Sequence, residues 1–412
     1  MTKKSDAPAI RFKGFSDAWE QRKLGDVADI VGGGTPSTGN QSYWDGDIDW
    51  YAPAEIADQI YANSSQKKIT GLGYENSSAK MLPPGTVLFT SRAGIGKTAI
   101  LTRKGCTNQG FQSIVPHRGE LDSYFIFSRT EELKRYGELV GAGSTFVEVS
   151  GKQMAVMELM MPPTMREQQT IGGFFQQLDH LITLHQRKFE KLTNVKKSML
   201  EKMFPQNGSS YPEIRFKGFT DPWEQRKLGE MGQTYTGLSG KTKDDFGHGQ
   251  ARFVTYMNVF SNPISNPEMT EPIESDPKQN EVEVGDVFFT TSSETPEEVG
   301  MSSILLEKRG KTYLNSFCFG FRPSEKIDSY YLAYMLRSES TRAKIILLAQ
   351  GISRYNISKN KVMEIAVSLP SLDEQKMIGQ YFSQLDNLIT LHQRELEKLQ
   401  NIKKSMLEKM FV

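Results

Sequence analysis

The stretch SRAGIGKTAI at residues 91–100 contains the end of a phosphate-binding loop, Gly96-Lys97-Thr98. In a complete loop of this kind, a glycine stands five positions before the Gly-Lys pair, so that backbone N–H groups can wrap the phosphates of ATP or GTP. The residue at that position is Ser91. The motif is therefore incomplete, and we expect no nucleotide site here.

The flanking residues favour a hairpin, because both VLFT (87–90) and AILT (99–102) have the composition of buried strands. A phosphate-binding loop would instead be followed by a helix. The simplest interpretation of the glycine-rich tip is a turn. Its polar side chains, Ser91, Arg92 and Lys97, are candidates for contacting the phosphates of a nucleic-acid backbone.

No other pattern of catalytic residues is present. The sequence lacks Gly-x-Gly-x-x-Gly, Gly-x-Ser-x-Gly, His-Glu-x-x-His and the Asn/Asp-Pro-Pro-aromatic motif of DNA amino-methyltransferases. Two cysteines, Cys106 and Cys318, make a disulfide framework or a four-ligand zinc site implausible. We therefore predict a non-catalytic chain that holds no metal or cofactor of its own.

Several polar loops carry residues that could read DNA. Asn108 and Gln109 lie in TNQGFQS (107–113), and asparagine and glutamine amides pair bidentately with adenine in the major groove. Each loop taken singly could be an ordinary surface turn. The other candidates are Thr35 and Ser37 in 32–44, Lys152 in 141–154, Lys241, Lys243, Arg252 and Tyr256 in 237–259, Asn315 in 314–321, and Arg354 and Lys359 in 349–363.

Composition and charge set broader limits. With 412 residues, 37% of them hydrophobic, the chain is long enough for two to four domains. No apolar run approaches the length of a membrane span, and the N-terminus has no secretory signal, so we expect a soluble cytoplasmic protein. Net charge is only +1, but residues 268–298 hold ten acidic side chains and one lysine. That stretch is not expected to lie on phosphates.

The sequence is written twice. Residues 10–27 return at 214–231 with 14 of 18 positions identical, and residues 167–204 return at 374–411 with 28 of 38 identical. The segments between these copies scarcely match, although they share a skeleton such as LPPGTVLFTS and VEVGDVFFTT. A constant frame around a variable insert suggests one assembly geometry with two different targets; drift after duplication is the alternative.

Both copied tails are predicted to be long helices that pair with each other. Apolar residues recur at alternating spacings of three and four, which is the seam of a coiled coil. An antiparallel pairing would bring Phe411 near Ile10 and Phe204 near Ile214, giving a pseudo-symmetric ring with two globular heads held apart by a two-helix rod. The seam residues are Ile171, Phe174, Leu178, Leu181, His185, Leu192, Val195 and Met199, with Ile378, Tyr381, Leu385, Leu388, His392, Leu399, Ile402 and Met406.

Two features of these helices have competing interpretations. His185 and His392 occupy matching seam positions; packed, hydrogen-bonded histidines are favoured over a metal pair. The lysine pairs 196–197 and 403–404 are interpreted first as a solvated helix face and second as a contact for a partner or DNA.

With these features in place, the chain resembles the specificity subunit of a Type I restriction–modification enzyme. The resemblance rests on the duplicated QRKLG segment, GGTPST…YWDGDIDW, SGKTKDDF…YMNV, the GTVLFT and GDVFFT hairpins and the LITLHQR helices. It covers essentially the whole chain and implies an α+β fold. Two pseudo-symmetric mixed α/β target-recognition domains (1–163 and 207–370) would be separated by two long antiparallel coiled-coil helices (164–206 and 371–412).

The resemblance also implies function and partners. Each domain would read one half of a split site in double-stranded DNA, and the helices would act as a ruler. Two methyltransferase subunits that use S-adenosylmethionine, and two restriction subunits that use ATP and Mg, would supply the chemistry of a defence against foreign DNA. The second half has the acidic TSSETPEEVG (291–300) where the first has SRAGIGK, so we do not expect both hairpins to contact phosphate.

Two other functions remain open from sequence alone. The heads of a coiled-coil scaffold could bind proteins instead of DNA. A nucleotide-dependent enzyme would rest on GIGKT alone.

Overall fold

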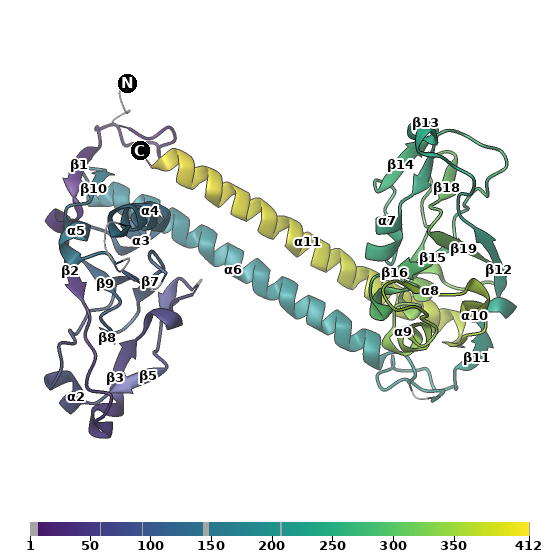
Figure 1. The fold of residues 1–412 in the computed structure, drawn as a ribbon, viewed down its shortest axis with the longest axis horizontal. Coiled ribbons are helices and arrows are strands. Elements are labelled where there is room, and N and C mark those ends of the chain that lie inside the picture. Colours follow the sequence, from purple (N-terminus) through teal and green to yellow (C-terminus); the bar gives the residue numbers. More distant parts are fainter. Residues whose placement is uncertain (1–6, 58, 93, 143–147, 207, 412) are drawn as a thin grey trace. The chain divides into compact units, whose positions relative to one another are not determined.

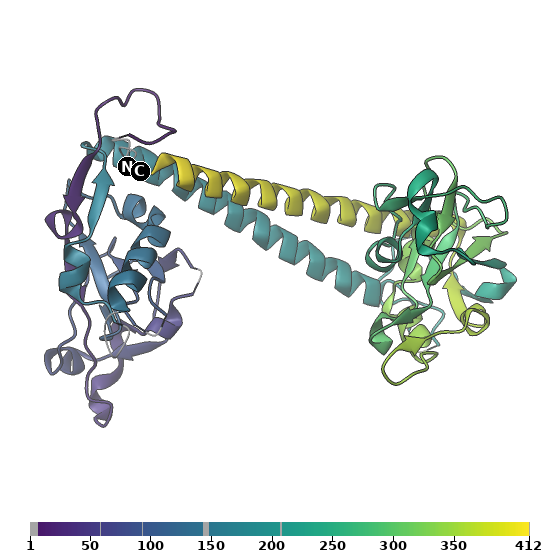
Figure 2. The same cartoon turned by 45° about the horizontal axis from the view of Figure 1, so that its top comes forward.

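The protein forms two compact units. A computed structural model describes residues 7–57, 59–92, 94–142, 148–206 and 208–411. One unit comprises Met1–His185 with Glu395–Val412, and the other comprises Gln186–Arg394 (Figures 1 and 2). Each unit therefore holds one variable insert and parts of both long helices. Our four-segment division of the sequence remains a prediction.

The first unit contains a five-stranded sheet in the order β2-β9-β6-β7-β4, a three-stranded sheet in the order β5-β3-β8, and the pair β1-β10. Strands β6 and β7 are antiparallel, which confirms the predicted hairpin. The strands are β1 Glu20–Lys23, β2 Ala28–Gly32, β3 Trp44–Tyr51, β4 Tyr61–Ala62, β5 Lys67–Ile69, β6 Val87–Phe89, β7 Thr98–Leu101, β8 Cys106–Thr107, β9 Gln112–Pro116 and β10 Glu158–Met161. The short helices are α1 Leu24–Val27, α2 Gly71–Glu75, α3 Ser123–Ser128, α4 Thr130–Gly141 and α5 Gly151–Ala155.

The second unit repeats this plan with a four-stranded sheet in the order β12-β19-β15-β17, a three-stranded sheet in the order β14-β13-β18, and the pairs β11-β21 and β16-β20. The mixed α+β character expected from the sequence is thus present in both units. The strands are β11 Glu224–Lys227, β12 Gly232–Thr236, β13 Phe246–Val254, β14 Thr270–Ile273, β15 Val287–Thr290, β16 Ser292–Ser293, β17 Ser302–Ile304, β18 Thr312–Leu314, β19 Cys318–Pro323, β20 Tyr355–Asn356 and β21 Ala366–Leu369. The short helices are α7 Tyr256–Ser261, α8 Ser329–Met335, α9 Glu339–Ile346 and α10 Lys359–Met363.

The copied frame closes each unit in the same way. Strand β1 pairs with β10 just before the first long helix, and β11 pairs with β21 just before the second. A buried glutamate near each helix start binds an arginine of the copied IRFKGF segment through two hydrogen bonds of 2.7 and 2.8 Å: Glu167 with Arg11, and Glu374 with Arg215. Each contact joins the two copied segments of one half, 10–27 to 167–204 and 214–231 to 374–411.

The two long helices expected from the sequence are present as α6 (Met165–Lys202) and α11 (Leu372–Met410), which lie within the predicted segments 164–206 and 371–412. Within the first unit Phe175 of α6 stacks on Phe411, with ring centroids 5.8 Å apart, and the Ile10 N–H donates to the Lys409 carbonyl. Within the second unit Phe382 of α11 stacks on Phe204 at 5.9 Å. The Ile214 N–H there donates to the Lys202 carbonyl. Both units therefore confirm the antiparallel pairing.

The predicted seam of these helices is buried only in part. Leu181 and Leu388 are 40% and 43% exposed, so the seam is not buried along its whole length. The fully buried side chains are Phe175 and Phe382, because the helix ends pack on aromatic residues of each unit and not only on each other.

The lysine pairs are not simply solvated. Lys403 binds Asp179 at 2.7 Å, and Lys196 binds Asp386 at 2.5 Å. A buried tyrosine of each unit donates to the same carboxylate at 2.8 Å: Tyr124 to Asp179 and Tyr334 to Asp386. Each carboxylate therefore ties the globular part of its unit to both helices.

Candidate nucleic-acid interface

The loops that the sequence predicts to read DNA meet at one turn in the first unit. The Oδ1 of Asn108 accepts a hydrogen bond of 2.8 Å from the Gly110 N–H. Backbone bonds then tie this turn to three other loops. They are Asn108 N–H to Tyr51 O at 3.0 Å, Gly34 N–H to Thr107 O at 2.8 Å, Ser91 N–H to Gly110 O at 2.8 Å, and Val149 N–H to Ser91 O at 3.0 Å.

The second unit has the same five bonds at matching residues. Asn315 Oδ1 accepts from the Phe317 N–H at 2.8 Å. The backbone bonds are Asn315 N–H to Val254 O at 3.1 Å, Leu238 N–H to Leu314 O at 2.8 Å, Thr291 N–H to Phe317 O at 2.9 Å, and Ile357 N–H to Thr291 O at 3.0 Å. We call each set of bonded residues the asparagine junction of its unit.

The two junctions hold the backbone in the same way, while the side chains around them differ between the units. Each lies where strands end, since Tyr51 closes β3 and Thr107 closes β8, as Val254 closes β13 and Leu314 closes β18. Side chains on loops held by strand ends are well placed to present a fixed pattern of donors and acceptors. The two inserts scarcely match in sequence, so a shared backbone carries two different surfaces.

The first unit presents most of its candidates at or beside the junction. Ser37, Gln109 and Lys152 are exposed, while Thr35, Arg92 and Asn108 are half-buried. The Thr35 hydroxyl donates to the Gln109 side-chain carbonyl, which joins two of the predicted loops. Residues 143–147 of the predicted loop 141–154 lie outside the described residues.

Ser91 does not support its predicted role. Its side chain is fully buried, because its backbone holds the centre of the junction through bonds to Gly110 and Val149. A hydroxyl in that position has no access to a phosphate.

Several candidate side chains in the second unit bind groups of the same unit and do not face solvent. Lys241 binds Asp276 at 3.0 Å and Asp245 at 3.5 Å, and the first of these contacts raises the pKa of Lys241. The backbone N–H of Lys278, with the Gln279 and Lys241 side chains, lowers the pKa of Asp276. This lysine therefore closes its loop and does not project into solvent.

Arg252 and Tyr256 are similarly engaged. The Arg252 guanidinium donates to the Thr270 hydroxyl and carbonyl. The Tyr256 hydroxyl donates to the Ser292 carbonyl at 2.7 Å, and burial raises the pKa of this tyrosine. The remaining candidates are Lys243 and Arg354, which are exposed, and Lys359 and Asn315, which are half-buried.

The asparagines are structural as well as candidate readers. A bidentate pair with adenine uses the amide oxygen as an acceptor and the amide nitrogen as a donor. The oxygens of Asn108 and Asn315 already accept a backbone N–H. Adenine pairing would thus require the same oxygen to accept a second hydrogen bond. The sequence alone does not indicate that this oxygen already has a backbone partner.

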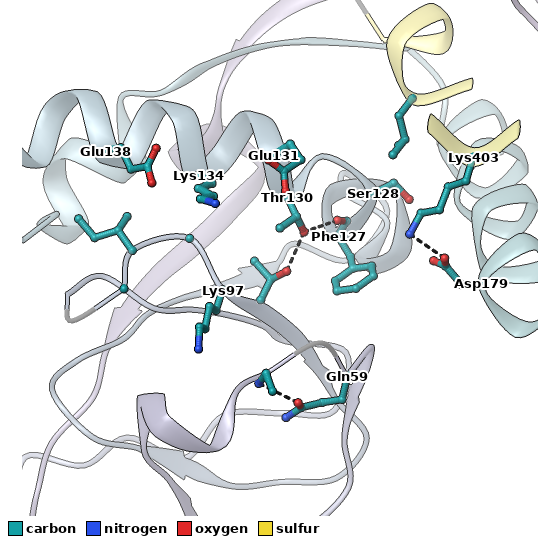
Figure 3. A pocket seen from close by; sticks show the side chains of 16 residues that line it. Gln59, Lys97, Phe127, Ser128, Thr130, Glu131, Lys134, Glu138, Asp179 and Lys403 are labelled. Atoms are coloured by element: carbon teal, nitrogen blue, oxygen red, sulfur yellow. Dashed lines mark hydrogen bonds and ion pairs between the residues drawn. The ribbon is translucent and has the colours of Figure 1, made fainter. Parts of the chain in front are cut away.

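The hairpin tip that resembles a phosphate-binding loop borders a pocket of 640 Å³ (Figure 3). Gly96 has φ of +95°, and an added Cβ would lie 2.3 Å from Cγ of Lys134. The described lining carries Lys97, Lys134 and Lys403 but also three carboxylates, one of which, Asp179, already binds Lys403. The segment after Gly96 is strand β7 and not a helix, so the geometry gives no support to a nucleotide site.

Other kinds of site find no support in the described part of the chain. No helix there is long and apolar enough to cross a membrane. No cluster of three or more histidine, cysteine or acidic side chains suitable for a metal ion occurs among the same residues.

The fold is therefore a duplicated α+β module, and the asparagine junction is repeated in both copies. The sequence model of the family described as Type I restriction modification DNA specificity domain matches residues 16–194 and again residues 220–401. The chain belongs to this family of specificity subunits.

Relatives in the same family are similar in sequence and in fold. The Type I restriction enzyme MjaIX specificity subunit of Methanocaldococcus jannaschii is 30% identical over 55% of this chain, and the match spans 54% of that protein's length. The putative MjaX specificity subunit of the same organism is 23% identical over 94% of this chain and 92% of its own. The crystal structure of a Type I S subunit from M. genitalium shares the fold, with a TM-score of 0.56, 14% identity and coverage of 98% of this chain and 99% of that one.

Proposed function

We propose that this chain is the DNA-recognition subunit of a Type I restriction–modification complex. Each unit would read one half of a bipartite target in the major groove through the side chains around its asparagine junction. The observation that carries this proposal is the repetition of five matched hydrogen bonds in inserts whose sequences scarcely match. Two half-sites of different sequence require the same backbone arrangement in both units with different side chains on it.

The helical frame would set the gap between the half-sites. Each helix is continuous, with 38 residues in α6 and 39 in α11, or about 57 Å at 1.5 Å per residue. The frame would also dock two methyltransferase subunits, and through them two restriction subunits. S-adenosylmethionine, ATP and Mg would be bound by those partners, this chain being non-catalytic and acting in the cytoplasm, with no membrane partner.

An exchange of inserts tests this division of labour. Replacing residues 28–163 with the corresponding insert of another family member should change one half of the recognised sequence and leave the other half and the gap intact. The measurement is the methylated motif in cells that express the chimera with the methyltransferase subunit.

The matched control is the reciprocal exchange of residues 232–370, which should change the other half only. A chimera that alters both halves would refute independent reading by each unit. A complex that methylates with no dependence on either insert would favour a scaffold whose heads bind proteins.

A further inference from the structure

Phe317 is an exposed aromatic side chain at the asparagine junction of the second unit. It is 54% exposed, although the residues directly after it, Cys318–Phe321, are all buried in β19. A single exposed apolar side chain is common on protein surfaces, so the position and the neighbours of Phe317 carry the argument, and not its exposure alone.

The main chain of Phe317 is held on both sides. Its N–H donates to Asn315 Oδ1 at 2.8 Å, and its carbonyl accepts from both the N–H and the hydroxyl of Thr291 at 2.9 Å. The ring therefore projects from a backbone that cannot move without breaking three hydrogen bonds.

A cation lies beside the ring. The Arg354 guanidinium carbon is 5.8 Å from the ring centroid, within the range of a cation–π contact. Arg354 stands on a loop closed by two hydrogen bonds between Gln350 and Asn356, of 3.0 and 2.9 Å. The segments 314–317 and 350–356 thus present one apolar ring and one positive charge together.

The first unit has no side chain at the same backbone position. The residue matching Phe317 is Gly110, where an added Cβ would lie 2.7 Å from Cγ of Pro53. The Nε of Arg92 is 3.4 Å from that Cβ position. The two junctions therefore differ at this backbone position: the second carries a ring beside Arg354, and the first carries a glycine that lies against Pro53 and Arg92.

Resting on the proposed function, we propose that Phe317 is a specificity-determining residue that contacts the C5-methyl group of a thymine in the half-site read by the second unit. Among the four unmodified bases, only thymine carries a methyl group on its major-groove edge, and apolar side chains recognise it by contact. Arg354 fixes the ring orientation and supplies positive charge toward the DNA backbone.

The test uses the full chain assembled with its methyltransferase subunits, and its target selected from a pool of random duplexes. Binding is measured on that target and on duplexes in which each thymine of the half-site is replaced singly by deoxyuridine, which removes only the methyl group. The wild-type complex should bind about fourfold more weakly at one such position, as expected for losing contact with one methyl group. Phe317→Ala should bind the thymine target more weakly and be indifferent to deoxyuridine at that position.

Two variants sharpen the result. Phe317→Leu should keep part of the sensitivity to the methyl group. Val284→Ala is the control, because it removes another exposed apolar side chain, which is 62% exposed. Val284 precedes the start of β15, whereas the junction follows its end, so this variant should behave as wild type. Unchanged discrimination at the other base pairs of the same half-site confirms that the second unit of each variant is folded.

The inference is overturned if Phe317→Ala keeps the wild-type response to deoxyuridine, or if the half-site contains no thymine whose methyl group matters. If the wild-type complex selects no sequence from the pool, the proposed function fails and this inference falls with it. This failure is distinguishable from the other outcomes because it is seen with the wild-type complex, before any variant is tested.

Discussion

Deleting one heptad from each long helix should shorten the gap between the two halves of the recognised sequence. Residues 184–190 of α6 and 391–397 of α11 are matching segments of the repeat, so their joint removal keeps the seam in phase and the two helices equal. Seven residues correspond to about 10.5 Å of helix, or up to about three base pairs at 3.4 Å per pair. The shortened chain should no longer contact both halves of the wild-type target at once. Its affinity for that target should therefore fall by more than any single side-chain substitution can cause.

The measurement is the methylated motif, or selection from duplexes that hold both half-sites at varied gaps. A control chain in which both segments are replaced by an unrelated heptad of equal length should keep the wild-type gap. If the shortened chain also keeps that gap, the helices do not set the spacing.

Substituting Glu374 by alanine should strongly destabilise the second unit. Its carboxylate is 1% exposed and binds Arg215, whose side chain is 15% exposed. Removing one partner leaves a nearly buried guanidinium without its counter-charge, and such changes lower the free energy of unfolding by about 3 kcal/mol or more. Denaturant unfolding of the purified chain, followed by tryptophan fluorescence, would report it through Trp223, which is buried in the core of the second unit.

The control for this prediction is Glu325→Ala, which breaks the exposed ion pair with Arg226. That change should shift the free energy of unfolding by no more than about 0.5 kcal/mol. Glu167→Ala in the first unit should cost more than Glu374→Ala, because Trp19 also donates to Glu167 at 3.2 Å whereas the Trp223 Nε1 is buried without a partner among the described residues. Equal effects of Glu374→Ala and Glu325→Ala would show that the buried pair does not anchor the helix.

Features set by local sequence were predictable. The hairpin at β6 and β7 follows from two apolar runs around a glycine-rich tip, and the long helices follow from heptad spacing without proline. The antiparallel pairing follows from the repeat itself, because only that direction returns the C-terminal helix to the first unit. The structure confirms all three.

The site was predictable only in outline. The polar loops were identifiable from composition, but their meeting point depends on backbone bonds between residues far apart in sequence, such as Ser91 with Gly110 and Val149. The same bonds bury Ser91, and nothing in the local sequence signals that. Lys241 carries the expected charge, but it forms an ion pair with Asp276, which lies far from it in the sequence.

Phe317 illustrates a signal that sequence reasoning passes over. In LNSFCFGF the aromatic residues look like one strand, and the asparagine draws attention as the polar residue. The turn formed by that asparagine ends before Cys318, so the first phenylalanine points out of the sheet that buries the next two. An asparagine followed two residues later by an aromatic at a strand start is the pattern that could have identified it.

The most direct test of the central claim is genomic methylation mapping by single-molecule sequencing. The comparison is between cells that express the methyltransferase subunit with this chain and cells that express that subunit alone. We expect a new methylated motif composed of one half-site, a fixed gap and a second half-site, present only with the chain. No change in methylation, with the same methyltransferase active on another specificity subunit, would contradict the account.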